Sequence, residues 1–218
     1  MTSVVFDIET APLTPDELAA QEPKFEGNAN TKDPEKIAAQ IEEKRRKWYE
    51  QAALSPMTGR IVAIGYATGG ETVVTHTALQ HTEAQMIEAF LATAREVSAQ
   101  SGHLYGYNVI RFDLPFIVRR AWANGIAVPR FILPGNRYWP DLFVDIADRF
   151  CFGNREDMVS LDTCGGFLGC GRKNGSGKHF AAMLTEDPER AVEYLRNDVL
   201  LTRKVGQRMG LIAEDVKP

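Results

Sequence analysis

Short apolar runs alternate along the chain with longer segments in which apolar residues recur every three or four positions. Short runs are typical of buried strands, and the longer period is typical of amphipathic helices. The pattern predicts strands over residues 3–6, 60–68, 72–77, 103–107 and 142–146. It predicts helices over residues 34–54, 82–99, 113–125, 160–168 and 185–209.

The order of these elements predicts an α/β fold. Gly69 and Gly70 separate two strands, which indicates a hairpin. Helices and strands alternate after it, which favours a partly antiparallel, mixed sheet with helices on its faces. A charged helical segment at about residues 22–57 follows the first strand, and we interpret it as an insertion. The length of 218 residues suits one domain, 1–218, that carries this insertion.

Composition narrows the functional classes. The formal net charge is −4, which disfavours a protein that coats duplex nucleic acid non-specifically. The longest apolar runs fall short of the ~20 residues of a membrane span, and the N-terminus lacks the basic and apolar regions of a signal peptide. Three cysteines without paired spacing indicate reduced thiols, so we expect a cytoplasmic protein.

The first candidate site is Asp7-x-Glu9 at the end of the apolar strand. Residues i and i+2 of a strand point to the same face, so both acids leave the sheet on one side. Close carboxylates repel each other, and a divalent cation relieves that repulsion. The alternative is a surface turn or a helix cap, because Asp-x-Glu is a common pattern.

The second candidate is Asp113, which follows the strand at 103–107 within Asn108-x-x-x-Phe112-Asp113. An aspartate where a loop meets a helix can simply cap the amides of residues 115 and 116. Pro115 lacks one of those amide donors, which weakens this alternative.

The third candidate is Tyr194-x-x-x-Asp198, whose two side chains share one face of the last predicted helix. That face continues into apolar residues, and a buried carboxylate needs a metal, a cation or hydrogen bonds. The alternative is that Tyr194 is a core aromatic and that Asp198 reaches water at the edge of the helix.

The three patterns in this order resemble the DEDDy group of 3′→5′ exonucleases, and most closely stand-alone proteins similar to the proofreading domain of family-B DNA polymerases. Residues 55–65 and 112–116 also resemble that group. A histidine five residues before the last aspartate would mark the sister DEDDh group, but Glu193 stands there. The resemblance implies an RNase H-like fold and hydrolysis of single-stranded DNA from its 3′ end, releasing nucleoside 5′-monophosphates.

The resemblance also implies two divalent cations, Mg²⁺ or Mn²⁺, roughly 3.5–4 Å apart. Asp7 would contact both ions, and Glu9 and Asp198 would hold the ion that activates water. Asp113 would act through waters on the second ion. Tyr194 would orient the attacking water, since a phenol with an ordinary pKa of ~10 is a poor base at neutral pH.

Four further residues are candidate contacts to the terminal nucleotide: Thr10 through its backbone, Asn108, Phe112 and Lys173. Phe112 packs either near the terminal bases or in the core. Lys173 lies in a glycine- and lysine-rich loop, 169–179, where similar proteins often carry a lysine; the alternative is a solvated loop.

Two other features carry weaker expectations. The basic run 44–47 is either a solvated helix face or a clamp on the nucleic-acid backbone. The cysteines Cys151, Cys164 and Cys170 with His179 fit no standard zinc spacing.

Three rival functions remain open from the sequence: an exoribonuclease acting on RNA 3′ ends, a nucleic-acid-binding module without activity, and a structure-specific endonuclease. The presence of all four acids and the tyrosine argues against the second, and an endonuclease has no need of Tyr194 beside Asp198.

Overall fold

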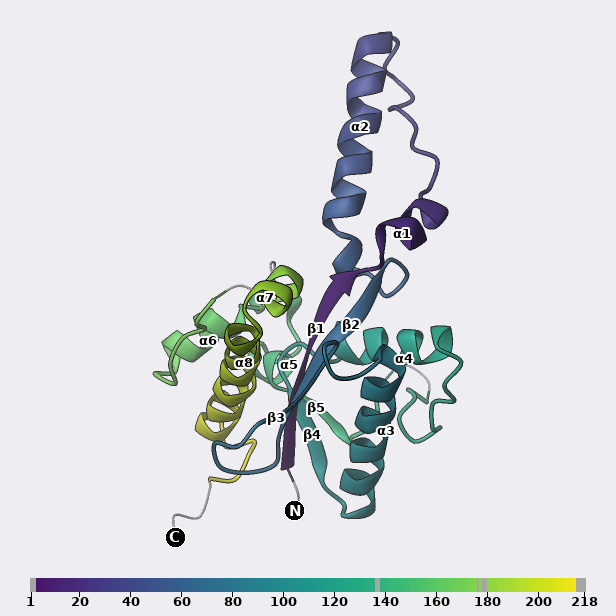
Figure 1. Cartoon of the computed structure of the whole chain (residues 1–218). Helices are drawn as coiled ribbons and strands as arrows, with labels where there is room; N and C mark the ends of the chain where they lie inside the picture. The colour runs from purple at the N-terminus through teal and green to yellow at the C-terminus, as the bar shows by residue number, and fades with distance from the viewer. Residues whose placement is uncertain (1–2, 136–137, 176, 178–179, 215–218) are drawn as a thin grey trace. The chain divides into compact units, whose positions relative to one another are not determined.

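The computed structural model describes residues 3–135, 138–175, 177 and 180–214 (Figure 1). The chain divides into two compact units. The first comprises Met1–Glu9 and Ile61–Pro218, and the second comprises Thr10–Arg60.

A five-stranded sheet is the centre of the fold. Its strands are β1 (Ser3–Pro12), β2 (Gly59–Ala67), β3 (Val74–Thr77), β4 (His103–Gly106) and β5 (Phe143–Asp145), in the order β3-β2-β1-β4-β5. β3 runs antiparallel to β2, whereas β4 is parallel to β1 and β5 is parallel to β4. The predicted hairpin and the predicted mixed sheet are therefore confirmed.

Helices cover both faces of this sheet. They are α3 (Glu83–Ala99), α4 (Asp113–Ala123), α5 (Ile146–Phe150), α6 (Leu161–Phe167), α7 (Phe180–Glu186) and α8 (Pro188–Arg208), with a 3₁₀ turn at Arg155–Asp157. α3 and α4 lie on one side, and α6, α7 and α8 lie on the other (Figure 1). Within the described ranges, no helix combines the length and the apolar character that crossing a bilayer requires.

The main core lies between the sheet and the pair α3 and α4. Every second residue of β1 enters it, as Val4, Phe6 and Ile8 are all buried there. The rings of Phe6 and Phe90 lie 5.1 Å apart between centroids. Because side chains alternate across a strand, the residues between these apolar positions point to the face that α8 covers.

Helix α3 begins with a capping box formed by Thr82 and Gln85. The Thr82 hydroxyl accepts from the Gln85 amide, and the Gln85 side chain accepts from the Thr82 amide. Glu83 then joins three elements, because its carboxylate accepts from the Ile61 amide at 2.8 Å and from the Arg120 guanidinium at 2.6 Å. Both charged side chains are only 12% exposed, so this pair connects α3 to α4 inside the fold.

The last helix begins later than the pattern predicted. α8 starts at Pro188, and Asp187 is its N-cap, accepting from the Arg190 amide at 3.1 Å. The predicted start at residue 185 was wrong because residues 185 and 186 end the preceding helix α7, which the sequence did not predict. Helix α5 was also not predicted, because it is a single short turn of helix after β5.

Unit Thr10–Arg60 contains α1 (Pro15–Gln21), α2 (Pro34–Glu50) and a 3₁₀ turn at Ala52–Leu54. Helix α2 ends at residue 50 rather than at 54. The small core of this unit consists of Leu13, Leu18 and Ala52. Two aromatic residues of α2, Trp48 and Tyr49, pack against it. No residue of α2 is itself buried.

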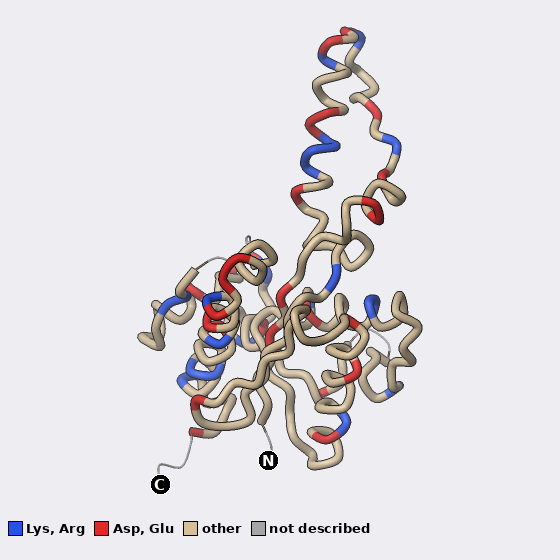
Figure 2. The backbone as a smooth tube through the Cα atoms, viewed as in Figure 1, with Lys and Arg blue, Asp and Glu red and all other residues tan. Residues whose placement is uncertain are grey.

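Figure 2 shows Lys and Arg interspersed with Asp and Glu along α2. Each cation of the run 44–47 has a partner within the same unit: the Glu26 carbonyl oxygen for Lys44, and the carboxylates of Glu22, Glu50 and Glu43 for the other three. Exposed pairs of this kind contribute little stability. Their pairing favours the solvated-face interpretation of this run over the nucleic-acid clamp.

Candidate active site

Asp7 and Glu9 lie inside β1, which continues to Pro12 instead of ending before the acids. Their neighbours Phe6 and Ile8 face the α3 side, so both carboxylates face α8. The spacing of two residues on a strand therefore places the pair on one face, as the sequence predicted.

Helix α8 brings Tyr194 and Asp198 to the same place. Tyr194 is 3% exposed to solvent and Asp198 is 2% exposed. The alternative in which Asp198 reaches water is therefore wrong. Helix α8 can lie this close to β2 because Gly65 has no side chain. A methyl group added at Gly65 would lie 3.0 Å from Leu195 and Val199 of α8. Carboxylate oxygens of Asp7, Glu9 and Asp198 lie within 4.8 Å of one another, the only such potential metal-binding group among the described residues.

Asp113 is the first residue of α4 and not its cap. The N-cap is Phe112, which makes no side-chain capping bond. The Asp113 carboxylate instead accepts from the Ile8 amide at 3.2 Å, a contact between residues 105 positions apart. The capping alternative is therefore wrong, because this side chain turns back toward β1. Asp113 lines the same cavity as Asp7 and Glu9, but it is not one of the three residues whose carboxylate oxygens lie within 4.8 Å of one another.

The chemistry of this cluster fits a divalent cation. Burial first, and then the neighbouring carboxylate of Asp198, raise the pKa of Asp7 to about 7. Burial also raises the pKa values of Glu9 and Asp113 well above their usual range, with Asp7 adding to both. In addition, Asp198 Oδ1 is buried and accepts no hydrogen bond from the described residues. A bound cation would stabilise all of these charges and would supply the missing partner of Oδ1.

Lys173 is the cation that the chain itself places here. Its Nζ lies 2.5 Å from Asp198 Oδ2 and 5.1 Å from the centre of the Tyr194 ring. Burial alone would lower the pKa of Lys173, but the Asp198 carboxylate outweighs burial and raises it. Lys173 therefore stays charged and compensates part of the negative charge of the cluster.

Replacing Lys173 by Met should destabilise the metal-free protein at pH 8, because the buried Asp198 would lose the one ion pair that it makes with the described residues. The Lys173 side chain is 26% exposed and the Asp198 side chain is 3% exposed. We therefore expect a loss of about 1–3 kcal/mol, between the values for exposed and buried pairs. Urea unfolding with chelator measures it, and Lys204→Met, at an exposed position on α8, is the matched control. Equal midpoints for wild type and Lys173→Met would contradict the expectation.

A cavity of about 500 Å³ opens onto the cluster. The acids, Tyr194, Lys173, Asn108 and Phe112 line it, together with residues that the sequence did not single out: Ile8, Tyr107, Met158, Val159, Ser160, Leu161 and Gly177. Phe112 is half-buried, packs against the core and also lines the cavity, and its contact with the terminal bases stays a prediction. Thr10 belongs to the other unit, and its proposed contact stays a prediction.

The glycine-rich loop comes close to the acids at Gly177. A methyl group added there would lie 3.2 Å from Glu9 Oε2, which is a tight contact, and 3.4 Å from the Tyr194 hydroxyl oxygen. Lys178 and His179 lie outside the described residues. The cysteines Cys151, Cys164 and Cys170 are free thiols, and no group of cysteines and histidines within the described part could hold a metal.

Comparison with known proteins agrees with this geometry. A family model described as "Predicted 3'-5' exonuclease related to the exonuclease domain of PolB" matches residues 54–218. The structure is similar to that of the family B DNA polymerase from the hyperthermophilic archaeon Pyrobaculum calidifontis, with a TM-score of 0.64, 16% identity, and coverage of 96% of this chain. The chain spans 24% of that polymerase's length. No curated protein gave a significant match.

The likeness to the polymerase identifies the fold as RNase H-like α/β, as predicted. The match at 54–218 includes Asp113, Tyr194 and Asp198 and covers more than half of the sequence. The chain therefore belongs to the family of predicted 3′–5′ exonucleases related to the exonuclease domain of PolB.

Proposed function

We propose that this protein removes nucleotides from the 3′ end of single-stranded DNA and releases nucleoside 5′-monophosphates, using two divalent cations, Mg²⁺ or Mn²⁺. The observation that carries the proposal is the convergence of Asp7, Glu9 and Asp198 within 4.8 Å, beside a cavity that Asp113 and Tyr194 also line. Such a cluster is costly without cations and is suited to holding them.

The charge of Asp7 acts on the other acids of the site. Its carboxylate lies within 4.8 Å of those of Glu9 and Asp198, and it also raises the pKa of Asp113. Asp7 would therefore contact both cations, Glu9 and Asp198 would hold the first, and Asp113 would hold the second through water. Cations at these positions would activate a water molecule and stabilise the leaving 3′-oxygen.

Tyr194 is suited to orient a water molecule and not to deprotonate it. Burial raises the pKa of its phenol above the ordinary value, which keeps the hydroxyl protonated. The Lys173 ammonium lies 5.1 Å from the centre of the Tyr194 ring, and the Tyr194 hydroxyl oxygen lies near Gly177, as does Glu9 Oε2. A protonated hydroxyl at this position can bind an attacking water near the acids.

Four groups would hold the terminal nucleotide. Asn108 and Phe112 line the cavity, and Lys173 offers a positive charge to a phosphate if it leaves Asp198. The Thr10 backbone would contribute a fourth contact. We also propose that residues 1–218 act as one exonuclease domain, in which the segment at about 22–57 is an insertion.

A ladder assay tests the proposal and separates its rivals. End-labelled DNA and RNA strands of the same sequence are digested with Mg²⁺, with Mn²⁺ and with chelator. Stepwise shortening of DNA from its 3′ end is the expected result. Faster shortening of RNA would indicate an exoribonuclease, a single internal cut an endonuclease, and binding without cleavage a non-catalytic module.

Tyr194→Phe should slow cleavage without abolishing it. Losing the hydroxyl leaves the attacking water less well oriented, which we expect to lower kcat by roughly 10- to 100-fold. The matched control is Tyr66→Phe, because the Tyr66 hydroxyl is buried and has no hydrogen-bond partner among the described residues. An unchanged kcat for Tyr194→Phe in single-turnover experiments would remove the proposed role.

A further inference from the structure

The carboxylate of Asp145 lies at the end of β5, next to the turn that carries Asn108. We propose that Asp145 is a positioning residue: its carboxylate holds this turn, residues 107–113, so that the Asn108 side chain faces the terminal nucleotide. The inference rests on the proposed function and adds to it a residue that contributes to substrate binding without touching the substrate.

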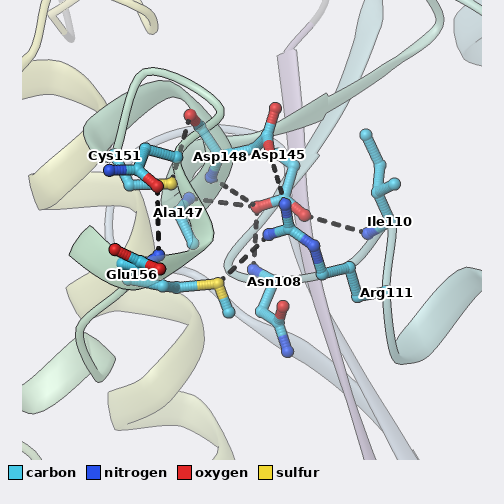
Figure 3. Close-up of polar contacts among 10 residues, drawn as sticks. Asn108, Ile110, Arg111, Asp145, Ala147, Asp148, Cys151 and Glu156 are labelled. Atoms are coloured by element: carbon cyan, nitrogen blue, oxygen red, sulfur yellow. Dashed lines mark hydrogen bonds and ion pairs between the residues drawn. The ribbon is translucent and has the colours of Figure 1, made fainter.

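Four backbone amides converge on this carboxylate, as Figure 3 shows. Asp145 Oδ1 accepts from the amides of Asn108 at 2.9 Å, Ala147 at 3.0 Å and Asp148 at 3.3 Å. Oδ2 accepts from the Ile110 amide at 3.0 Å. Asp145 is 2% exposed, and a carboxylate buried so deeply requires such donors. It therefore connects α5 to the turn 107–113.

The conformation of the turn makes this support important. Asn108 has a φ of 64°, in the left-handed region, which asparagine adopts more readily than most residues but which is not its most favourable conformation. Its own side chain does not hold the turn, since Asn108 Oδ1 accepts no hydrogen bond from the described residues. The backbone conformation thus decides where the carboxamide lies, and the bonds to Asp145 stabilise that conformation.

Asp113, at the other end of the turn, has separate support. Its carboxylate accepts from the Ile8 amide, and its backbone is the first turn of α4. Loosening the Asp145 contacts should therefore displace Asn108 more than Asp113. The inference predicts a selective defect: a higher KM for the nucleic acid and an unchanged concentration of Mn²⁺ for half-maximal activity.

Two substitutions separate the turn from the helix cap. Serine is as good an N-cap as aspartate, so Asp145→Ser keeps the cap of α5 but is too short to reach Ile110. Asp145→Asn is the milder change, because it keeps one oxygen and places an amide group opposite the Ile110 N–H. Asn108→Gly removes the carboxamide and allows the positive φ without strain.

Steady-state cleavage of a 3′-labelled DNA strand with Mn²⁺ gives KM and kcat for these variants and for the Asn108→Gly/Asp145→Asn double variant. We expect Asp145→Asn and Asp145→Ser to raise KM about tenfold, the size of a lost bond to a charged group, with kcat changed less than threefold. The double variant should match Asn108→Gly alone, because both substitutions remove the same contact. Hydrogen exchange should also show faster exchange of residues 107–113 in Asp145→Ser.

The control is Asp33→Asn, at another aspartate that caps a helix, in the other unit; its KM should equal that of the wild type. Multiplying effects in the double variant, or a shifted Mn²⁺ requirement with normal KM, would overturn the inference and show a general structural role. Unchanged exchange of residues 107–113 would overturn it independently of activity. A wild-type protein that neither binds nor cleaves DNA would instead refute the proposed function.

Discussion

Asp7→Asn should lower kcat for DNA cleavage by about 10³-fold or more, because it removes the carboxylate central to the cation site. Cation catalysis of phosphoryl chemistry supplies several kcal/mol of transition-state stabilisation, and about 1.4 kcal/mol corresponds to tenfold in rate. Asparagine has nearly the same shape, so the fold should remain. Burial and the Asp198 charge raise the pKa of Asp7, so the neutral side chain should also leave the metal-free protein at least as stable as the wild type at pH 8.

Single-turnover cleavage measures the expected loss of rate, and thermal unfolding of the same preparations measures the expected stability. Asp16→Asn, at an exposed aspartate of α1, is the control and should cleave like the wild type. Cleavage by Asp7→Asn within tenfold of the wild-type rate would contradict the proposed site. Loss of activity together with a large drop in melting temperature would instead assign Asp7 a structural role.

Removing divalent cations should abolish cleavage and should lower the melting temperature more at pH 8 than at pH 5. The pKa of Asp7 is about 7 in the fold, above its usual value of 3.8. Its protonation stabilises the metal-free fold, and this contribution is complete below about pH 4 and is lost as the pH rises through 7. Cations bind the ionised acids, so their stabilising effect should appear over the same pH interval.

The expected size follows from mass action. A cation at 100 times its Kd stabilises the fold by about 2.7 kcal/mol, which corresponds to roughly 5–10 °C for a chain of this length. Scanning fluorimetry with chelator and with Mn²⁺ at both pH values measures the shift, and Asp7→Asn should lose most of it. Potassium chloride at equal ionic strength is the control. Cleavage that persists in chelator, or identical melting temperatures with and without Mn²⁺ at pH 8, would refute the cation site.

Several features of the site follow from local sequence alone. The alternation Phe6-Asp7-Ile8-Glu9 places two acids on one face of a strand wherever that strand lies. The spacing of Tyr194 and Asp198 likewise places both on one face of a helix. Thr82 and Gln85 form a capping box, which involves only residues three positions apart and is therefore a local feature of the sequence.

Other features could not be decided from the sequence because they join residues far apart in the chain. The sequence offered Asp113 both as a site residue and as a helix cap, and only its contact with Ile8 excludes the cap. Asp145 ends a short apolar run before a helix, and the capping rule would have identified it, but its bonds to Asn108 and Ile110 cross from β5 to another turn. The sequence offered Lys173 as a candidate contact to the nucleotide, but its ion pair with Asp198 appears only where the loop meets α8.

One physical cause separates the features that the sequence predicts from those that only the tertiary structure determines. Periodicity and capping depend on neighbours within about one turn of the chain, so the faces of β1 and α8 could be derived from the order of residues. Burial, pKa shifts and ion pairs depend on which elements pack together. The close approach of α8 to Gly65 of β2, and the return of Asp113 to Ile8, create the low-dielectric cluster in which these acids need a cation.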